Sequence, residues 1–211
     1  MLYIFDDIDG LDDGFPEQHI SFLSEERRIK AFSYRFPLDR KLSVAVYLLL
    51  RLALIEKYGI DEPVVFSYGN NGKPFLRDYP HINYNISHCR SAAACVIADD
   101  SVGVDVQEIA PVPDGLAQHV LSADEYAGYR DSRNPEDFFC AIWTIKESWL
   151  KRTGQGIGTD LKTLPVQGMK TLYRGKDYYC CVNGADVQLH RVSSFGIFWE
   201  YRHESVFSGT F

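Results

Sequence analysis

The sequence predicts an α+β protein built from two similar lobes. Two observations lead to this prediction: each half contains one long helical segment, and each half also contains short apolar or alternating segments separated by turn signals. The chain has 211 residues, 45% of them hydrophobic, which suffices for one large domain or two small ones with a substantial core. Pro111 and Pro113 lie between the halves, so we place an N-terminal lobe at residues 1–109 and a C-terminal lobe at residues 110–211.

The elements of the first half follow from local patterns. Residues 2–5 (LYIF) have the composition of a strand, and Ser24 has the character of a helix N-cap because two acidic residues follow it, which suits the helix dipole. Residues 39–58 are almost continuously apolar and flanked by charge, so they predict a buried helix that ends at Gly59. Four further apolar segments predict strands: residues 64–69, 82–87, 92–99 and 102–109.

The second half begins with a helix signal and ends with strand signals. Ser122, followed three residues later by Glu125, has the pattern of a capping box, and a helix that contains residues 138–154 comes after it. Three segments with period-two stretches and polar turns predict an antiparallel meander: residues 178–182, 187–192 and 196–202.

Charge and hydropathy limit the kind of protein. The net charge of −7 argues against a broad nucleic-acid-binding face. No apolar run reaches the roughly 18 residues of a membrane span, and the first residues lack a signal-peptide pattern, so we expect a cytoplasmic protein that is not bound to a membrane. Residues 27–41 nevertheless carry six basic side chains and one acidic one. This patch suits a small anion or an acidic partner surface, although a solvated helix face would have the same pattern.

The segment of residues 102–109 (VGVDVQEI) places a carboxylate beside a glycine. In a strand, its three valines would face the core while Gly103, Asp105 and Gln107 would line the opposite face. A glycine beside a carboxylate lets a ligand or another backbone come close, which is useful where a hard cation and a phosphate are held together. An ordinary strand whose polar face meets water is the alternative.

The helical segment of residues 138–154 holds two charged residues, Lys146 and Glu147, inside an aromatic and aliphatic run. At helical spacing, Trp143, Glu147 and Lys151 fall on one line. Burial of a carboxylate without a partner is costly, so Glu147 has to pair, take up a proton, bind a metal or reach a cleft. A pair with Lys151 would contribute only about 0.2–0.5 kcal/mol. We therefore favour a carboxylate that faces a cleft.

Two loops add polar groups of the same kind. Lys73 lies between a glycine and a proline, which fixes the approach of a cation on a short loop, and Ser87 and His88 end a predicted strand. Adjacent residues of a strand face opposite sides, so a catalytic Ser–His pair is disfavoured and phosphate binding fits both residues better.

In this order, the motifs resemble those of the Sfp-type 4′-phosphopantetheinyl transferases, which load the phosphopantetheine arm of coenzyme A onto carrier proteins. The resemblance rests on residues 71–76 (NGKPFL), 84–88 (YNISH), 102–109 and 138–158. It implies a monomer of two pseudo-symmetric lobes, each a small, mainly antiparallel sheet packed on a long helix, with the active site at the interface between them.

The resemblance also implies roles for the motif residues. Asp105 and Glu147 would bind Mg²⁺, or Mn²⁺ in its place, together with the diphosphate of coenzyme A, and Lys151 would contact phosphate. These three form the expected catalytic set, with Glu147 also the candidate general base. The residues expected to hold the nucleotide and its phosphates are Lys73, Ser87, His88, Arg27 and Lys30.

Gln107 departs from the pattern of many family members, which carry an acid at this position. Its amide oxygen can still ligate Mg²⁺ but adds no charge, so we expect either Gln107 as a neutral metal ligand or a water in its place, and a lower affinity for the ion. Glu108 is adjacent to it but faces away in a strand.

The predicted activity is transfer of 4′-phosphopantetheine from coenzyme A to a serine of an apo acyl or peptidyl carrier protein, with release of adenosine 3′,5′-bisphosphate. The neutral Gln107 leaves open a catalytically weakened coenzyme A-binding regulator as an alternative. The basic residues 27–41 suit either an acidic carrier helix or the phosphates of coenzyme A, and the sequence does not decide between them.

Overall fold

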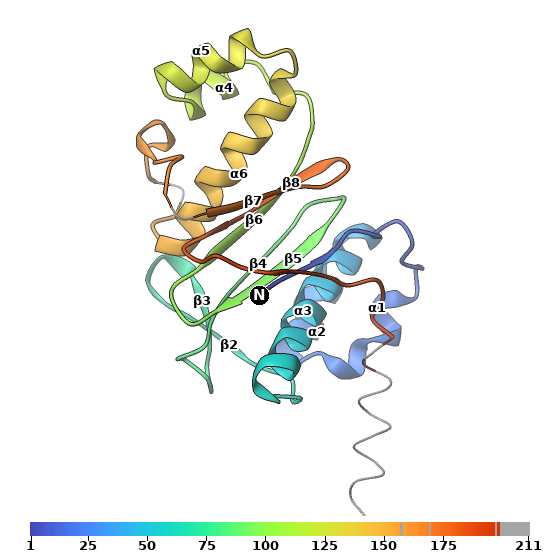
Figure 1. Cartoon of the computed structure of the whole chain (residues 1–211). Helices are drawn as coiled ribbons and strands as arrows, with labels where there is room; N and C mark the ends of the chain where they lie inside the picture. Colours follow the sequence, from blue (N-terminus) through green and yellow to red (C-terminus); the bar gives the residue numbers. More distant parts are fainter. Residues whose placement is uncertain (157, 169, 197, 199–211) are drawn as a thin grey trace, which may run out of the picture.

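The computed structural model describes residues 1–156, 158–168, 170–196 and 198 as four stacked layers: a helix, two sheets and a second helix (Figure 1). The first sheet has the strand order β4-β5-β1-β9, and the second has the order β6-β8-β7. Their bounds are β1 Leu2–Phe5, β4 Asn83–His88, β5 Ala93–Ala98, β6 Gly103–Glu108, β7 Lys170–Arg174, β8 Tyr178–Asn183 and β9 Leu189–Arg191. A small hairpin pairs β2, Phe66–Tyr68, with β3, Pro74–Leu76.

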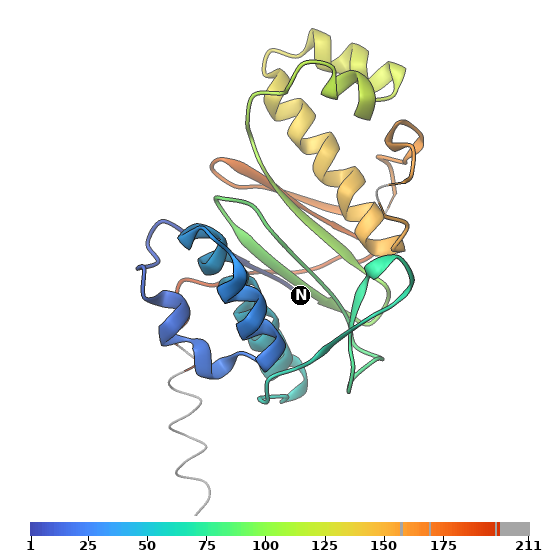
Figure 2. The ribbon, with the colours of Figure 1, turned by 180° about the vertical axis from the view of Figure 1, so that it is seen from behind.

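Helix α3, Pro37–Tyr58, forms the first layer. Proline suits the first turn because its missing N–H would be unpaired there, and Gly59 ends the helix in the left-handed conformation with φ 66°. Every residue from Leu42 to Leu54 is buried. The helix packs on the outer face of the first sheet, and α1, Phe15–Gln18, and α2, Glu25–Ser33, lie beside it (Figure 2). The predicted buried helix is confirmed.

The inner faces of the two sheets share a second core. It contains Leu2, Ile4 and Val96 from the first sheet and the valines of β6 with Cys180 and Val182 from the second. The predicted inward direction of Val102, Val104 and Val106 is thereby confirmed, since each is at most 1% exposed. The opposite face of β6 is left to helix α6, Pro135–Thr153, which covers the second sheet.

Side chains join the two sheets where β4 runs beside β6. The Val104 amide donates to Asn85 Oδ1 over 2.9 Å, and the Val106 amide donates to Ser87 Oγ over 3.2 Å. Strands β4 and β6 belong to different sheets, and here the amides of β6 bond to side chains of β4 instead of to its backbone carbonyls. Polar residues at the end of β4 are therefore held against the strand that carries Asp105.

Two short helices cap the far end of α6: α4, Leu116–Val120, and α5, Ala123–Asp131 (Figure 1). The capping box predicted at Ser122 and Glu125 is confirmed at the start of α5. Three 3₁₀ turns complete the described elements: η1 Ile20–Phe22, η2 Asn70–Gly72 and η3 Leu161–Thr163. Among the described residues, no helix has both the length and the apolar character needed to cross a bilayer.

The α+β class is confirmed. Hydrogen bonds place β6 in the second sheet, beside β8, while β4 and β5 lie in the first sheet. The division into lobes at residues 1–109 and 110–211 stays a prediction. The antiparallel meander is wrong for β9, which pairs in parallel with β1 of the first sheet. Strands β3 and β7 and helices α1 and α4 were not predicted, and the expected strand at residues 196–202 falls largely outside the described residues.

Candidate active site

Gly103 brings α6 directly over β6. A Cβ at this position would collide with the Ser148 carbonyl oxygen and the Arg152 amide nitrogen of α6. Of the two explanations for the glycine, close approach of another backbone is the one that the structure supports. Because Asp105 lies two residues along the same face, its carboxylate is held beneath α6.

The Asp105 carboxylate is 4% exposed and only half satisfied. Its Oδ1 accepts hydrogen bonds from Lys151 Nζ over 2.6 Å and from Ser87 Oγ over 3.1 Å. Its Oδ2 has no hydrogen-bond partner in the described part of the chain. Burial raises the pKa of Asp105, while Lys151 and Ser87 act in the opposite direction. The site therefore presents a buried carboxylate oxygen that is free to bind a donor or a cation.

Glu147 faces the same pocket as Asp105. The pocket encloses about 690 Å³, and Asp105, Gln107 and Glu147 supply polar groups to a lining that also includes Trp143. Burial, followed by the negative charge of Asp105, raises the pKa of Glu147, whereas Lys151 lowers it. A carboxylate whose pKa is raised by a second carboxylate in the same pocket marks a place where a cation would be stabilised.

Lys151 and Ser87 form a small network around Asp105. Lys151 Nζ also donates to Ser87 Oγ over 2.8 Å, and this hydroxyl accepts the Val106 amide as well. The one proton of the Ser87 hydroxyl goes to Asp105. Ser87 is thus placed to orient the carboxylate and the ammonium, and it could donate to a phosphate only after release from Asp105.

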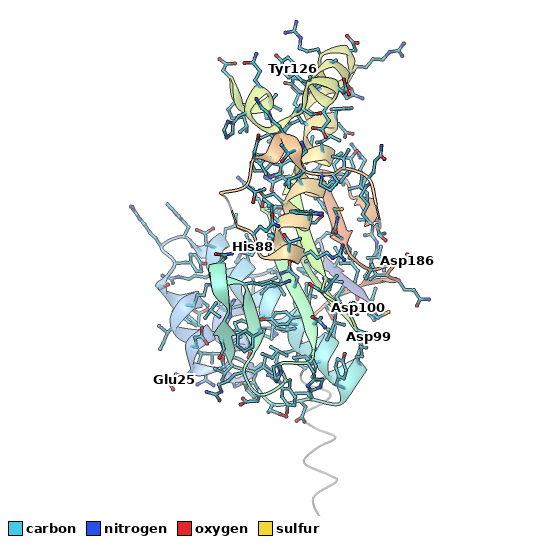
Figure 3. All side chains as sticks on the ribbon, turned by 90° about the vertical axis from the view of Figure 1, so that its left-hand side faces the viewer. Glu25, His88, Asp99, Asp100, Tyr126 and Asp186 are labelled. Atoms are coloured by element: carbon cyan, nitrogen blue, oxygen red, sulfur yellow. The ribbon has the colours of Figure 1, made fainter. Side chains whose placement is uncertain are left out.

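A second pocket of about 350 Å³ gathers cationic side chains. Arg27, Lys30, His88 and Lys151 line it together with Ser87. Figure 3 shows His88 at mid-height of the molecule, near the lower end of α6. Although this imidazole is exposed, desolvation by the surrounding protein, and then the positive charges of Lys151 and Arg27, lower the pKa of His88. An anion in this pocket would reverse the effect of those charges.

Arg27 is the most deeply buried of these cations, at 4% exposed. Its Nη2 donates to the Ser43 carbonyl over 2.8 Å, and its guanidinium lies 5.4 Å from the centroid of the Tyr47 ring. Within the described residues it has no carboxylate partner, and burial lowers its pKa. Because this buried guanidinium lines the second pocket and lacks such a counter-ion, it is a candidate contact for an anionic ligand.

A third pocket, of about 340 Å³, connects the other two. It shares Lys151 with the pocket lined by Arg27 and His88, called the cationic pocket below. It shares Glu147 with the pocket lined by Asp105, called the carboxylate pocket below. Lys73 lines it, but its ammonium donates to the Arg152 carbonyl at the end of α6 over 2.6 Å. Asn71 Nδ2 adds a bond to the Gly154 carbonyl over 3.0 Å. In this structure the loop between β2 and β3 therefore fastens to the end of α6.

Several residues that line these pockets belong to none of the sequence motifs. Tyr34 and Tyr68 line the cationic pocket, and Leu116, His119 and Leu161 line the carboxylate pocket. No motif surrounds them, and only the fold brings them near the site. No group of three or more His, Cys, Asp or Glu residues lies in a metal-binding arrangement in the described ranges.

Comparisons with known proteins agree with the motifs. Residues 101–191 match the 4′-phosphopantetheinyl transferase superfamily, and residues 16–101 match the N-terminal part of 4′-phosphopantetheinyl transferases. The chain is 33% identical over 154 residues to the transferase psf-1 of Bacillus pumilus, covering 72% of this chain and 66% of that protein. It is 28% identical over 154 residues to the transferase Sfp of Bacillus subtilis strain 168, covering 72% of this chain and 69% of Sfp.

A further relative is the L-aminoadipate-semialdehyde dehydrogenase-phosphopantetheinyl transferase of Xenopus laevis, with 29% identity over 173 residues, covering 73% of this chain and 56% of that protein. The chain thus spans about two thirds of the length of the two bacterial relatives. Since both halves match this one family and the motif residues meet around one set of adjoining pockets, the chain belongs to the 4′-phosphopantetheinyl transferase superfamily.

Proposed function

We propose that this protein transfers the 4′-phosphopantetheine arm of coenzyme A to a serine of an apo acyl or peptidyl carrier protein and releases adenosine 3′,5′-bisphosphate. The observation that carries the proposal is the carboxylate of Asp105, which has an unpartnered Oδ2 and lines one pocket with Glu147, close to a cationic pocket. We propose further that it acts as a cytoplasmic monomer, without nucleic acid or membrane.

Mg²⁺ suits the residues at the carboxylate end. The donor set consists of Asp105, Glu147 and the neutral Gln107, and oxygen ligands with one or two carboxylates are typical of Mg²⁺ sites that also bind phosphate. A bound cation would satisfy Asp105 Oδ2 and remove the mutual repulsion of the two carboxylates. When bound, the ion would neutralise the charge that develops on the diphosphate.

The side chains of the chain divide the remaining tasks. Arg27, Lys30 and His88 would hold the phosphate of the nucleotide in the cationic pocket, and Lys151 would reach the diphosphate between the two pockets. Glu147 would accept the proton of the carrier serine, directly or through a water, although a bound cation would make this carboxylate a weaker base than it is in the metal-free protein. Gln107 and Asp105 would orient the diphosphate of coenzyme A, where the reaction takes place.

The test is an incubation of the purified protein with coenzyme A, Mg²⁺ and a panel of apo carrier domains, followed by intact-mass analysis. A carrier that gains the mass of one phosphopantetheine group is expected, and Glu147→Gln is expected to abolish the gain. Coenzyme A binding with no gain on any carrier would contradict the transferase proposal and favour the regulator. Gln107→Glu should lower the Mg²⁺ concentration required, and an unchanged requirement would remove Gln107 from the metal site.

A further inference from the structure

The side chain of Lys146 points away from the pocket that its neighbour Glu147 lines. It is 1% exposed, and its ammonium lies 2.5 Å from Glu125 Oε2 and 2.9 Å from the Val120 carbonyl oxygen. On a helix, consecutive side chains point about 100° apart, so Lys146 is directed toward α4 and α5 while Glu147 lines the pocket. The two adjacent charged residues of this apolar run therefore have different surroundings: Lys146 contacts α4 and α5, and Glu147 lines the pocket.

Glu125 connects this ammonium to the ends of two helices. Its Oε2 also accepts the Ser122 amide over 2.8 Å, as part of the capping box that begins α5. The Val120 carbonyl belongs to the last turn of α4. Figure 3 shows α5, marked by Tyr126, at the opposite end of α6 from His88. A single ammonium thus ties the end of α4 and the start of α5 to the middle of α6.

The tied segment forms a wall of the carboxylate pocket. Leu116 and His119 of α4 line this pocket together with Trp143 and Glu147 of α6. Trp143, three residues before Lys146, packs against Phe139 with ring centroids 5.8 Å apart and ring planes tilted by 35°. Any movement of α4 relative to α6 would change the width of the pocket at Glu147.

We propose that Lys146 and Glu125 are positioning residues that hold the α4 wall at a fixed distance from Glu147. Apolar side chains could fill the same space, but they would not select one register between α6 and the α4–α5 junction, whereas a buried ion pair with two further hydrogen bonds has one favourable geometry. The expected effect of this ion pair on turnover rests on the proposed transferase function. Its expected effect on the width of the carboxylate pocket does not depend on that function.

The test compares three variants: Glu125→Gln, Lys146→Met and the double variant. Each single change leaves one buried charge without its partner, while the double change removes both. We expect each single variant to lower kcat by about tenfold to a hundredfold, because a misplacement of about 1 Å near reacting groups can have an effect of this size. Acrylamide quenching of Trp143 fluorescence should increase in the same variants, when it is measured in a background in which the other two tryptophans are replaced, Trp149→Phe and Trp199→Phe.

Ser122→Ala is the matched control. It removes the hydroxyl that caps the Glu125 amide but leaves the Glu125 carboxylate and Lys146 in place. It should lower thermal stability while leaving kcat and the quenching of Trp143 unchanged.

If the single variants fail to fold, the double variant decides. A folded double variant with wild-type kcat and wild-type quenching would overturn the proposal, and so would folded single variants with those properties. If the unmodified protein transfers nothing to any carrier, the proposed function fails. Increased quenching in the variants, beside an unchanged control, would still support the positioning role.

Discussion

Replacement of Gly103 by alanine should damage both stability and turnover. In an ordinary strand the change to alanine stabilises a protein by about 0.4–1 kcal/mol, because the unfolded chain loses conformational freedom. Here the new Cβ would overlap the Ser148 carbonyl oxygen and the Arg152 amide nitrogen, which belong to backbone rather than to a flexible side chain. Overpacking of this kind typically costs about 1–3 kcal/mol, so we expect the free energy of unfolding to fall.

The size of the change can be followed by heat and by kinetics. A chain of this length should lose about 2–4 °C of melting temperature for each kcal/mol. Relief of the overlap requires α6 to move away from β6, and Glu147 and Lys151 adjoin the two residues that would be struck. A shift of about 1 Å could lower kcat by about a hundredfold.

Gly69→Ala is a suitable control, since a Cβ there would lie at an ordinary 3.8 Å from the Lys73 carbonyl oxygen. This variant should remain within about 0.5 kcal/mol of the wild type. If Gly103→Ala were as stable and as active as Gly69→Ala, close contact between α6 and β6 would not be what requires the glycine.

Three further predictions concern the carboxylates and the loop that holds α6. Because the pKa of Glu147 is raised, this carboxyl keeps its proton to a higher pH in the folded metal-free protein than in the unfolded chain. The stability gained by Glu147→Gln in urea unfolding should therefore grow as the pH rises above the ordinary glutamate pKa of about 4.3, and a gain that does not change with pH would contradict the raised pKa. Mg²⁺ at 100 times the Kd of the wild type should raise the free energy of unfolding by about 2.7 kcal/mol. An equal rise in Asp105→Asn at the same Mg²⁺ concentration would show that the ion binds elsewhere. Lys73→Met should lower the free energy of unfolding by about 0.3–1 kcal/mol in the absence of coenzyme A, because its ammonium lies at the carbonyl end of α6, and unchanged thermal stability would rule out this role.

The sequence predicted those parts of the fold that depend on local signals. Helix α3 and the capping box at Ser122 were found because their apolar patterns and end residues lie close together in the chain. The inward valines of β6 follow from strand alternation, and Asp105 and Glu147 indeed line one pocket. Their roles as metal ligands and base stay predictions.

Contacts between distant residues could not be predicted in the same way. Neither the pairing of β9 with β1 nor the side-chain bonds between β4 and β6 leaves a mark in either segment alone. Lys73 shows a similar limit: the loop sequence indicates a cation of fixed direction, but only the fold reveals that this cation meets the last turn of α6. Lys146 likewise depends on a partner carried by another helix.

The parallel pairing of β1 with β9 has a consequence for biosynthesis. Strand β1, Leu2–Phe5, is synthesised well before β9, Leu189–Arg191, which pairs with one of its edges. Until β9 is made, β1 therefore presents unpaired amides and carbonyls at this edge, and such an edge can recruit strands from other nascent chains. The protein should depend on chaperones while it is being made, and fragments that stop before β9 should aggregate.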